Sequence, residues 1–106
     1  MNILPKTVTF QWDQGNIHKN LLKHSVTTQE AEEIFVLKSF YIKQDAKHSS
    51  STEQRYSGLG KTKDKRLLFV AFTIRDEKIR AISVRDMKRI ERKGYEEAQE
   101  DTRLQK

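Results

Sequence analysis

The chain has 106 residues, enough for one hydrophobic core and too few for two ordinary domains, so we expect a single domain over residues 1–106. Its 21 Lys and Arg residues outnumber 15 Asp and Glu residues, and the net charge of +6 favours polyanionic partners such as nucleic acid. The absence of cysteine excludes disulfides and thiolate zinc sites. The three histidines, His18, His24 and His48, lack the spacing that puts two metal ligands on one helix face. We therefore expect neither a metal nor another cofactor.

The apolar runs of the sequence are short. None approaches the length of a membrane span, and residues 1–5 lack the charged start and long apolar stretch of a secretory signal. These features predict a cytoplasmic protein that does not contact a membrane.

The N-terminal half carries clear strand and helix signals. Alternating β-branched and aromatic residues over 7–12 predict a first strand. Asp13 is a typical N-cap, and the helix after it is predicted to run to about Lys23. Thr27 is followed three residues later by Glu30, the pattern of a capping box, which predicts a second helix starting near residue 28.

The middle of the chain is predicted to be mainly strand. Residues 40–43 form a candidate short strand, and the serine-rich segment 44–52 is predicted to be a mobile loop. Apolar or alternating runs predict three further strands, over residues 53–60, 67–72 and 79–84. The strand over 67–72 is uninterrupted apolar, which predicts burial on both faces.

The last strand is predicted to lead into a basic helix that starts at about Asp86. A strand period of two puts Arg80, Ile82 and Val84 on one face of that strand, and Ile79, Ala81, Ser83 and Arg85 on the other. Apolar residues become sparse after the helix begins, so residues 96–106 are predicted to form a mobile tail. A partner-docking surface and a frayed terminus are both consistent with this tail.

A cluster of cations is predicted at the turn over residues 76–77. If those two residues form the hairpin loop, Arg75 pairs with Lys78, Thr73 pairs with Arg80, and all four side chains share one face. Such crowding of like charges calls for an anion or a carboxylate, which makes this corner a candidate phosphate cradle. The alternative interpretation is a solvated edge whose charges prevent association between sheets.

Short motifs follow one another along the chain in a characteristic order. In the first half they are Phe10-Gln-Trp12-Asp13, Asn16, Asn20, Lys23-His24, Glu30-Ala31 and Ile34-Phe35. In the second half they are Glu53-x-Arg55, Thr73-x-Arg75, Ile79-Arg80-x-Ile82-Ser83-x-Arg85, Glu91-Arg92 and Tyr95. Their order and spacing resemble the BrnT family of toxins from bacterial type II toxin–antitoxin systems. The chain departs from the family pattern at Ser25, where glycine is usual, and at Val84 and Met87, where alanine is common.

The resemblance implies an α+β, RelE-like fold: a small antiparallel sheet with two N-terminal helices and a C-terminal helix, in the order β-α-α-β-β-β-α. It also implies a metal-independent ribonuclease that inhibits translation. The implied partner is a ribbon-helix-helix antitoxin like BrnA, which neutralises the toxin, and operator DNA is contacted only through that antitoxin.

RNA cleavage by the ribose 2′-oxygen needs a base, an acid and cations for the developing charge. Arg55, Arg75 and Arg80 suit the cation role because guanidinium groups bind phosphate oxygens bidentately and stay charged. His24 and Glu53 are the candidates for proton transfer.

Further side chains are candidates for RNA binding, and they are Lys23, Thr73, Arg85 and Tyr95. Purely structural interpretations stand beside these roles. His24 can cap a helix C-terminus, and Glu53 with Arg55 can be an exposed ion pair.

Two functions therefore stay open. The first is a ribonuclease toxin held inactive by its antitoxin. The second is a non-catalytic nucleic-acid-binding or operon-regulatory module whose arginines only neutralise phosphates.

Overall fold

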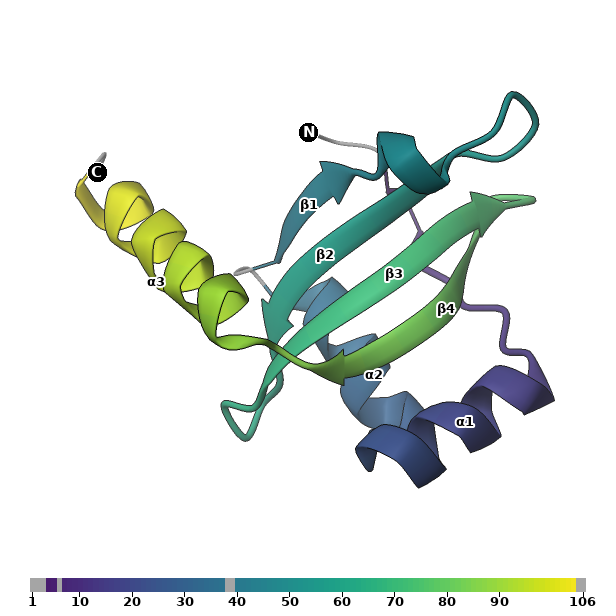
Figure 1. Cartoon of the computed structure of the whole chain (residues 1–106), viewed down its shortest axis with the longest axis horizontal. Helices are drawn as coiled ribbons and strands as arrows, with labels where there is room; N and C mark the ends of the chain where they lie inside the picture. The colour runs from purple at the N-terminus through teal and green to yellow at the C-terminus, as the bar shows by residue number, and fades with distance from the viewer. Residues whose placement is uncertain (1–3, 6, 38–39, 105–106) are drawn as a thin grey trace.

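A computed structural model describes residues 4–5, 7–37 and 40–104 of the chain. In these ranges, three α-helices and a four-stranded antiparallel sheet form an α+β fold, as predicted (Figure 1). The helices are α1 (Gln14–His24), α2 (Thr28–Val36) and α3 (Arg89–Leu104). The strands, which are also neighbours in this order, are β1 (Tyr41–Gln44), β2 (Arg55–Lys61), β3 (Leu67–Arg75) and β4 (Lys78–Asp86).

The N-terminal segment differs from the prediction, because residues 7–12 do not form a strand of the sheet. Phe10 makes a single parallel bridge to Ile79, and two backbone hydrogen bonds of 2.8 Å, Gln11 N to Ile79 O and Ile79 N to Thr9 O, join the segments. The chain then leaves the edge of β4, since Asp13 starts α1. The observed order is α-α-β-β-β-β-α. The sheet has four strands because β1, and not the segment over residues 7–12, forms the additional one.

The predicted starts of α1 and α2 are confirmed, whereas the third helix starts at Arg89 rather than at about Asp86, because β4 continues to Asp86. The Asp13 carboxylate accepts a hydrogen bond of 3.2 Å from Asn16 N at the start of α1. At the start of α2, Thr27 and Glu30 form the predicted capping box, with two reciprocal bonds of 3.1 Å. These caps satisfy backbone N–H groups that have no partner within the helix.

Ser25 ends α1 in the left-handed conformation, with φ of 53° and ψ of 36°. A residue with a Cβ atom has a higher conformational free energy in the left-handed region than glycine has. Ser25→Gly is therefore expected to raise the free energy of unfolding by about 0.5–1 kcal/mol. Urea denaturation should show a higher midpoint with an unchanged slope. A lower midpoint would contradict this account of the helix end.

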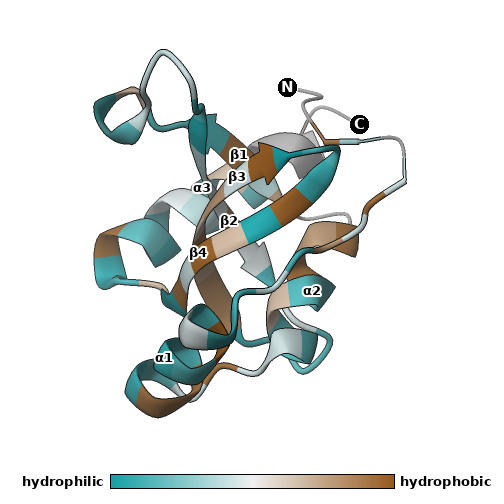
Figure 2. Cartoon of the chain, turned by 90° about the vertical axis from the view of Figure 1, so that its right-hand side faces the viewer, coloured by the Kyte–Doolittle hydropathy of each residue, from teal (hydrophilic) through white to brown (hydrophobic). Residues whose placement is uncertain are grey.

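The hydrophobic core lies between the sheet and α2, on the face that we call the inner face. Leu68, Val70 and Phe72 of β3 point to this face and are fully buried. Leu67 and Phe69 point to the opposite, outer face and are only half-buried. The prediction that this strand is buried on both faces is therefore wrong, because α2 covers one face and α3 lies over only part of the other (Figure 2).

A β-bulge in β4 overturns the predicted assignment of its two faces. Ser83 pairs with Ala71 and Ala81 pairs with Phe72, so Ile82 falls between two register positions. After the bulge, the alternation of side chains is shifted by one residue. Buried Val84 consequently joins buried Ile79 and Ala81 on the inner face, whereas Arg80, Ser83 and Arg85 share the outer face.

Two asparagines of α1 bind the backbone of β4 on both sides of this bulge. Asn16 Nδ2 donates to Ala81 O at 3.3 Å, and Val84 N donates to Asn20 Oδ1 at 3.2 Å. The asparagines are four residues apart, so they lie on the same face of α1. They thus satisfy backbone groups of β4 on both sides of the bulge.

The predicted loop over 44–52 contains a short 3-10 helix, η1 (Ala46–His48). Ser49 ties it to the sheet, because Ser49 Oγ donates to Asp45 O at 2.7 Å and accepts from Arg55 N at 2.9 Å. The mobility predicted for this segment stays a prediction. So does that of the tail over 96–106, in which α3 continues to Leu104 and residues 105–106 lie outside the described ranges.

Candidate functional site

A row of polar side chains crosses the outer face of the sheet near the β3–β4 turn. Asp45 N donates to Arg55 O at 2.8 Å, which extends the pairing of β1 with β2 by one residue. Arg55 pairs with Thr73, and Thr73 pairs with Arg80. Four segments thus place Asp45, Arg55, Thr73 and Arg80 side by side.

The β3–β4 turn has the predicted geometry. Asp76 and Glu77 form the two-residue loop with φ of 52° and 61°, and Arg75 pairs with Lys78 across it. The predicted sharing of one face by Thr73, Arg75, Lys78 and Arg80 is confirmed.

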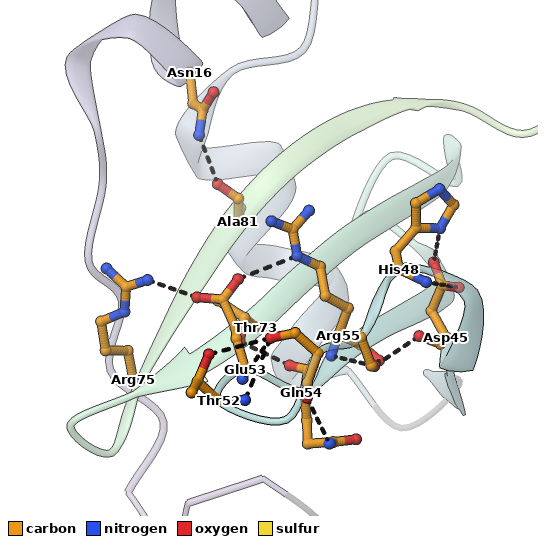
Figure 3. Close-up of polar contacts among 12 residues, drawn as sticks. Asn16, Asp45, His48, Thr52, Glu53, Gln54, Arg55, Thr73, Arg75 and Ala81 are labelled. Carbon is orange, nitrogen blue, oxygen red and sulfur yellow. Dashed lines mark hydrogen bonds and ion pairs between the residues drawn. The ribbon is translucent and has the colours of Figure 1, made fainter.

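Glu53 is the counter-charge of this corner. Its Oε1 lies 3.1 Å from Arg55 Nε, and its Oε2 lies 2.6 Å from Arg75 Nη2 (Figure 3). The hydrogen bond from Arg75, with that from Arg55, holds the pKa of the Glu53 carboxyl below its usual value. An ionised carboxylate therefore bridges two guanidinium groups that come from different strands.

Thr73 holds the backbone next to Glu53 in place. Its side chain is buried, and its hydroxyl donates to Gln54 O at 2.8 Å. The bond fixes the segment between Glu53 and Arg55. Because this hydroxyl is buried and already bonded, the structure supports a positioning role for Thr73 rather than the predicted contact with RNA.

Arg80 lies on the same face but leans towards the start of α1. Its Nη2 lies 3.6 Å from Asp13 Oδ2, and 30% of its side chain is exposed. Arg55, Arg75 and Arg80, which we call the arginine cluster, thus occupy one end of the outer face. Only the first two share a carboxylate.

A histidine that was not among the predicted site residues, His48, lies beside this cluster. His48 Nδ1 is 2.8 Å from Asp45 Oδ2, and the hydrogen bond with His48 lowers the pKa of the Asp45 carboxyl. The imidazole is 62% exposed, and Figure 3 shows it projecting in the same general direction as the Arg55 guanidinium. The spacing Asp45-x-x-His48, typical of a capped turn, was the signal in the sequence.

Lys23 and His24 lie away from the arginine cluster, at the C-terminal end of α1. This helix of 11 residues is about 16 Å long, and Asp13, the partner of Arg80, precedes its other end. The His24 carbonyl accepts a 2.9 Å bond from Arg66 Nη2. The length of the helix therefore separates His24 and Lys23 from the arginine cluster, and their roles in catalysis and RNA binding stay predictions.

Arg85 and Tyr95 hold α3 against the sheet. Two nitrogens of Arg85 bond the Glu91 carboxylate at 2.8 and 3.0 Å, and its guanidinium carbon lies 4.1 Å from the centre of the Phe69 ring. Tyr95 is buried, with its ring centre 5.5 Å from that of Tyr41. Both residues therefore have structural contacts, and the structure separates them from the arginine cluster.

Arg66 joins three elements through a network of long-range contacts. Its guanidinium bonds the Asp86 carboxylate at 2.8 and 3.0 Å and Glu30 Oε2 at 3.1 Å. It also donates to the carbonyls of Ser25 and His24, each at 2.9 Å. This side chain links the end of α1, the start of α2 and the end of β4.

No group of three or more His, Cys, Asp or Glu side chains in the described ranges is arranged to hold a metal ion. No helix within them has the length and apolar character needed to cross a membrane.

Comparisons with known proteins were made for the whole chain. A family described as "Ribonuclease toxin, BrnT, of type II toxin-antitoxin system" matches residues 12–91. A similar solved structure is the 1.1 Å crystal structure of the Brucella abortus ribonuclease toxin BrnT, with a TM-score of 0.57 and 19% sequence identity. The match covers 78% of this chain and 100% of that one, and at this identity it shows the fold alone. No curated protein matches the sequence.

Proposed function

The chain belongs to the BrnT family of ribonuclease toxins of type II toxin–antitoxin systems, and we propose that it cleaves RNA without a metal ion at the arginine cluster. The observation that carries this assignment is the Glu53 carboxylate, which Arg55 and Arg75 hold at 3.1 and 2.6 Å. A phosphodiester offers two non-bridging oxygens that guanidinium groups bind in a similar way. The cluster is thus already arranged around an anion.

The arginines supply the positive charge that this reaction needs. Negative charge grows on the phosphate oxygens as the ribose 2′-oxygen attacks, and fixed cations stabilise that charge most in the transition state. Arg55 and Arg75 are held in place by Glu53, so little reorganisation is needed when RNA binds. Arg80, on the same face, adds a third cation.

His48 is the group that we assign to proton transfer. In the reaction, the 2′-hydroxyl loses its proton, the 2′-oxygen bonds phosphorus, and the bond from phosphorus to the 5′-oxygen breaks as that oxygen gains a proton. Imidazole suits such transfer at neutral pH, and Asp45 orients the ring through Nδ1 at 2.8 Å. Glu53 was the earlier candidate, but its lowered pKa makes it a weak base, and it positions the arginines instead.

Replacing His48 with Gln is expected to lower kcat about 100-fold, because the variant keeps a polar side chain but cannot transfer a proton. The pH–rate profile should also lose one limb. His18, exposed on α1, provides a matched control, since His18→Gln makes the same change away from the cluster. Equal kcat values for the two variants would remove His48 from the mechanism.

The partners follow from the type of system. A type II toxin is neutralised by a protein antitoxin, and we assign that role to a ribbon-helix-helix protein through which alone the pair contacts operator DNA. The proposed site of action is the cytoplasm, where cleavage of RNA inhibits translation. Co-expression of a ribbon-helix-helix protein from a neighbouring gene should restore the growth of cells that produce the toxin. Persistent growth arrest would contradict this choice of antitoxin.

The activity is tested directly by incubating the purified protein with single-stranded RNA and EDTA. The proposal predicts fragments with 2′,3′-cyclic phosphate and 5′-hydroxyl ends, identified by mass spectrometry. Cleavage that needs added Mg²⁺ would contradict metal independence. Binding without scission would instead favour the non-catalytic nucleic-acid-binding module.

A further inference from the structure

A cavity of about 380 Å³ lies between α3 and the outer face of the sheet. It is lined by residues of the strands and of α3, among them Tyr41, Ser57, Leu59, Phe69, Glu91 and Gly94. We propose that this cavity binds a nucleobase of the RNA substrate next to the cleaved bond. The inference rests on the proposed ribonuclease function and identifies a second part of the same substrate site.

The cavity is continuous with the arginine cluster along β2. Ser57 lies two residues from Arg55 on the same face, a separation of about 7 Å, and Leu59 lies about 14 Å from Arg55. Ser57 pairs with Ala71, and both side chains are small. An RNA strand whose phosphate is bound by Arg55 therefore meets the cavity within the next nucleotide or two.

The walls of the cavity have the chemistry of a base-binding site. Phe69, Tyr41 and Leu59 are half-buried and present aromatic and aliphatic surface. Unpaired bases bind such surfaces with their faces, while polar groups at the rim read their edges. Ser57 and Lys43 supply a hydroxyl and an ammonium group at this rim.

The charges around the cavity favour RNA as its occupant. Glu91 is the carboxylate among the lining residues, and Arg85 neutralises it through bonds of 2.8 and 3.0 Å. The same guanidinium lies over the Phe69 ring. Because Arg85 balances the charge of Glu91, the ammonium group of Lys43 leaves a net positive charge at the rim, so a polyanion meets a cationic and apolar surface here.

Gly94 offers a way to fill the cavity without disturbing the fold. A Cβ atom built on Gly94 meets nothing within 4 Å, and its backbone has no positive φ. Leucine is also a better helix former than glycine. Gly94→Leu should therefore fold with a melting temperature no lower than that of the wild type, while its side chain occupies the cavity.

The test compares RNA cleavage by the wild type, Gly94→Leu and a matched control. Glu96→Leu places the same side chain at an exposed position of α3 outside the cavity, and Glu96→Gln, measured beside it, accounts for the lost negative charge. Gly94→Leu is expected to lower kcat/KM on single-stranded RNA about tenfold, because a base–aromatic contact is lost. Glu96→Leu should stay within about twofold of the wild type, since it leaves this contact intact. Equal kcat/KM values for the wild type and Gly94→Leu would overturn the inference.

Substrates with one abasic nucleotide identify the occupant. The abasic nucleotide is moved through the positions beside the cleaved bond. At one position it should lower kcat/KM of the wild type about tenfold, whereas kcat/KM of Gly94→Leu should fall no further there. If the abasic nucleotide lowers kcat/KM equally in both proteins, the cavity does not bind a base, but the proposed ribonuclease function is unaffected. If the wild type cleaves no RNA, the proposed function itself has failed. If Gly94→Leu cleaves normally but escapes its co-expressed antitoxin, the cavity holds a protein segment instead.

Discussion

Replacing Arg75 with Ala is expected to lower the rate of RNA cleavage by about 10²–10³-fold, because one of the two guanidinium groups that hold the scissile phosphate is lost. Arg75 is 49% exposed, and its side chain bonds Glu53. Its removal should therefore change the melting temperature little. Single-turnover cleavage of a short RNA measures the effect without interference from product release.

Lys78 provides the matched control for this prediction. It pairs directly with Arg75 across the hairpin, shares its face and is also exposed. Lys78→Ala removes the same charge from the same corner, so general attraction for RNA falls equally in both variants. If both variants lose activity to the same extent, the arginines only attract RNA. Arg75→Lys should recover a minor part of the activity, since an ammonium group lacks the planar fork.

The second large effect concerns stability. Arg66→Ala is expected to lower the free energy of unfolding by about 2–3 kcal/mol, because it leaves Glu30 and two carbonyls at the end of α1 without a strong donor. Asp86 contributes less to this loss, since 62% of its side chain is exposed and solvent screens its charge. Urea denaturation measures the change.

Two further variants show whether the geometry of Arg66 matters. Arg66→Lys should recover less than half of the loss, because one ammonium group cannot serve acceptors from α1, α2 and β4 together. Arg89→Ala, on an exposed position of α3, should change stability by no more than about 0.5 kcal/mol. If Arg66→Ala were as mild as Arg89→Ala, the network would be an ordinary surface contact.

The sequence predicts those parts of this fold that local chemistry determines. Asp13, Thr27 and Glu30 mark helix starts because a cap involves residues within one turn. The turn over residues 76–77 was predictable for the same reason, and with it the shared face of Arg75 and Thr73. The family resemblance added the α+β class and the ribonuclease activity.

Long-range contacts determine the parts that were predicted wrongly. The alternation over residues 7–12 is strand-like, but only one position meets a partner at the edge of β4. The bulge at Ile82 is held by Asn16 and Asn20, more than 60 residues earlier in the chain, and no local signal in β4 reveals it.

In the candidate site, too, local features were predictable from the sequence and long-range positions were not. Glu53 and Arg55 are predictable because they lie two residues apart, with Arg55 starting β2, whereas the serine-rich context conceals His48. His24 was chosen for its chemistry, and only the position of α1 shows that it lies far from the arginines.

A crystal structure with bound RNA tests the central claim most directly. An RNA with 2′-deoxyribose at the cleavage position lacks the attacking hydroxyl and should bind intact. The account predicts that non-bridging oxygens of its phosphate lie within hydrogen-bond distance of Arg55 and Arg75, with the His48 imidazole next to the same phosphodiester. A phosphate bound away from both arginines would contradict it.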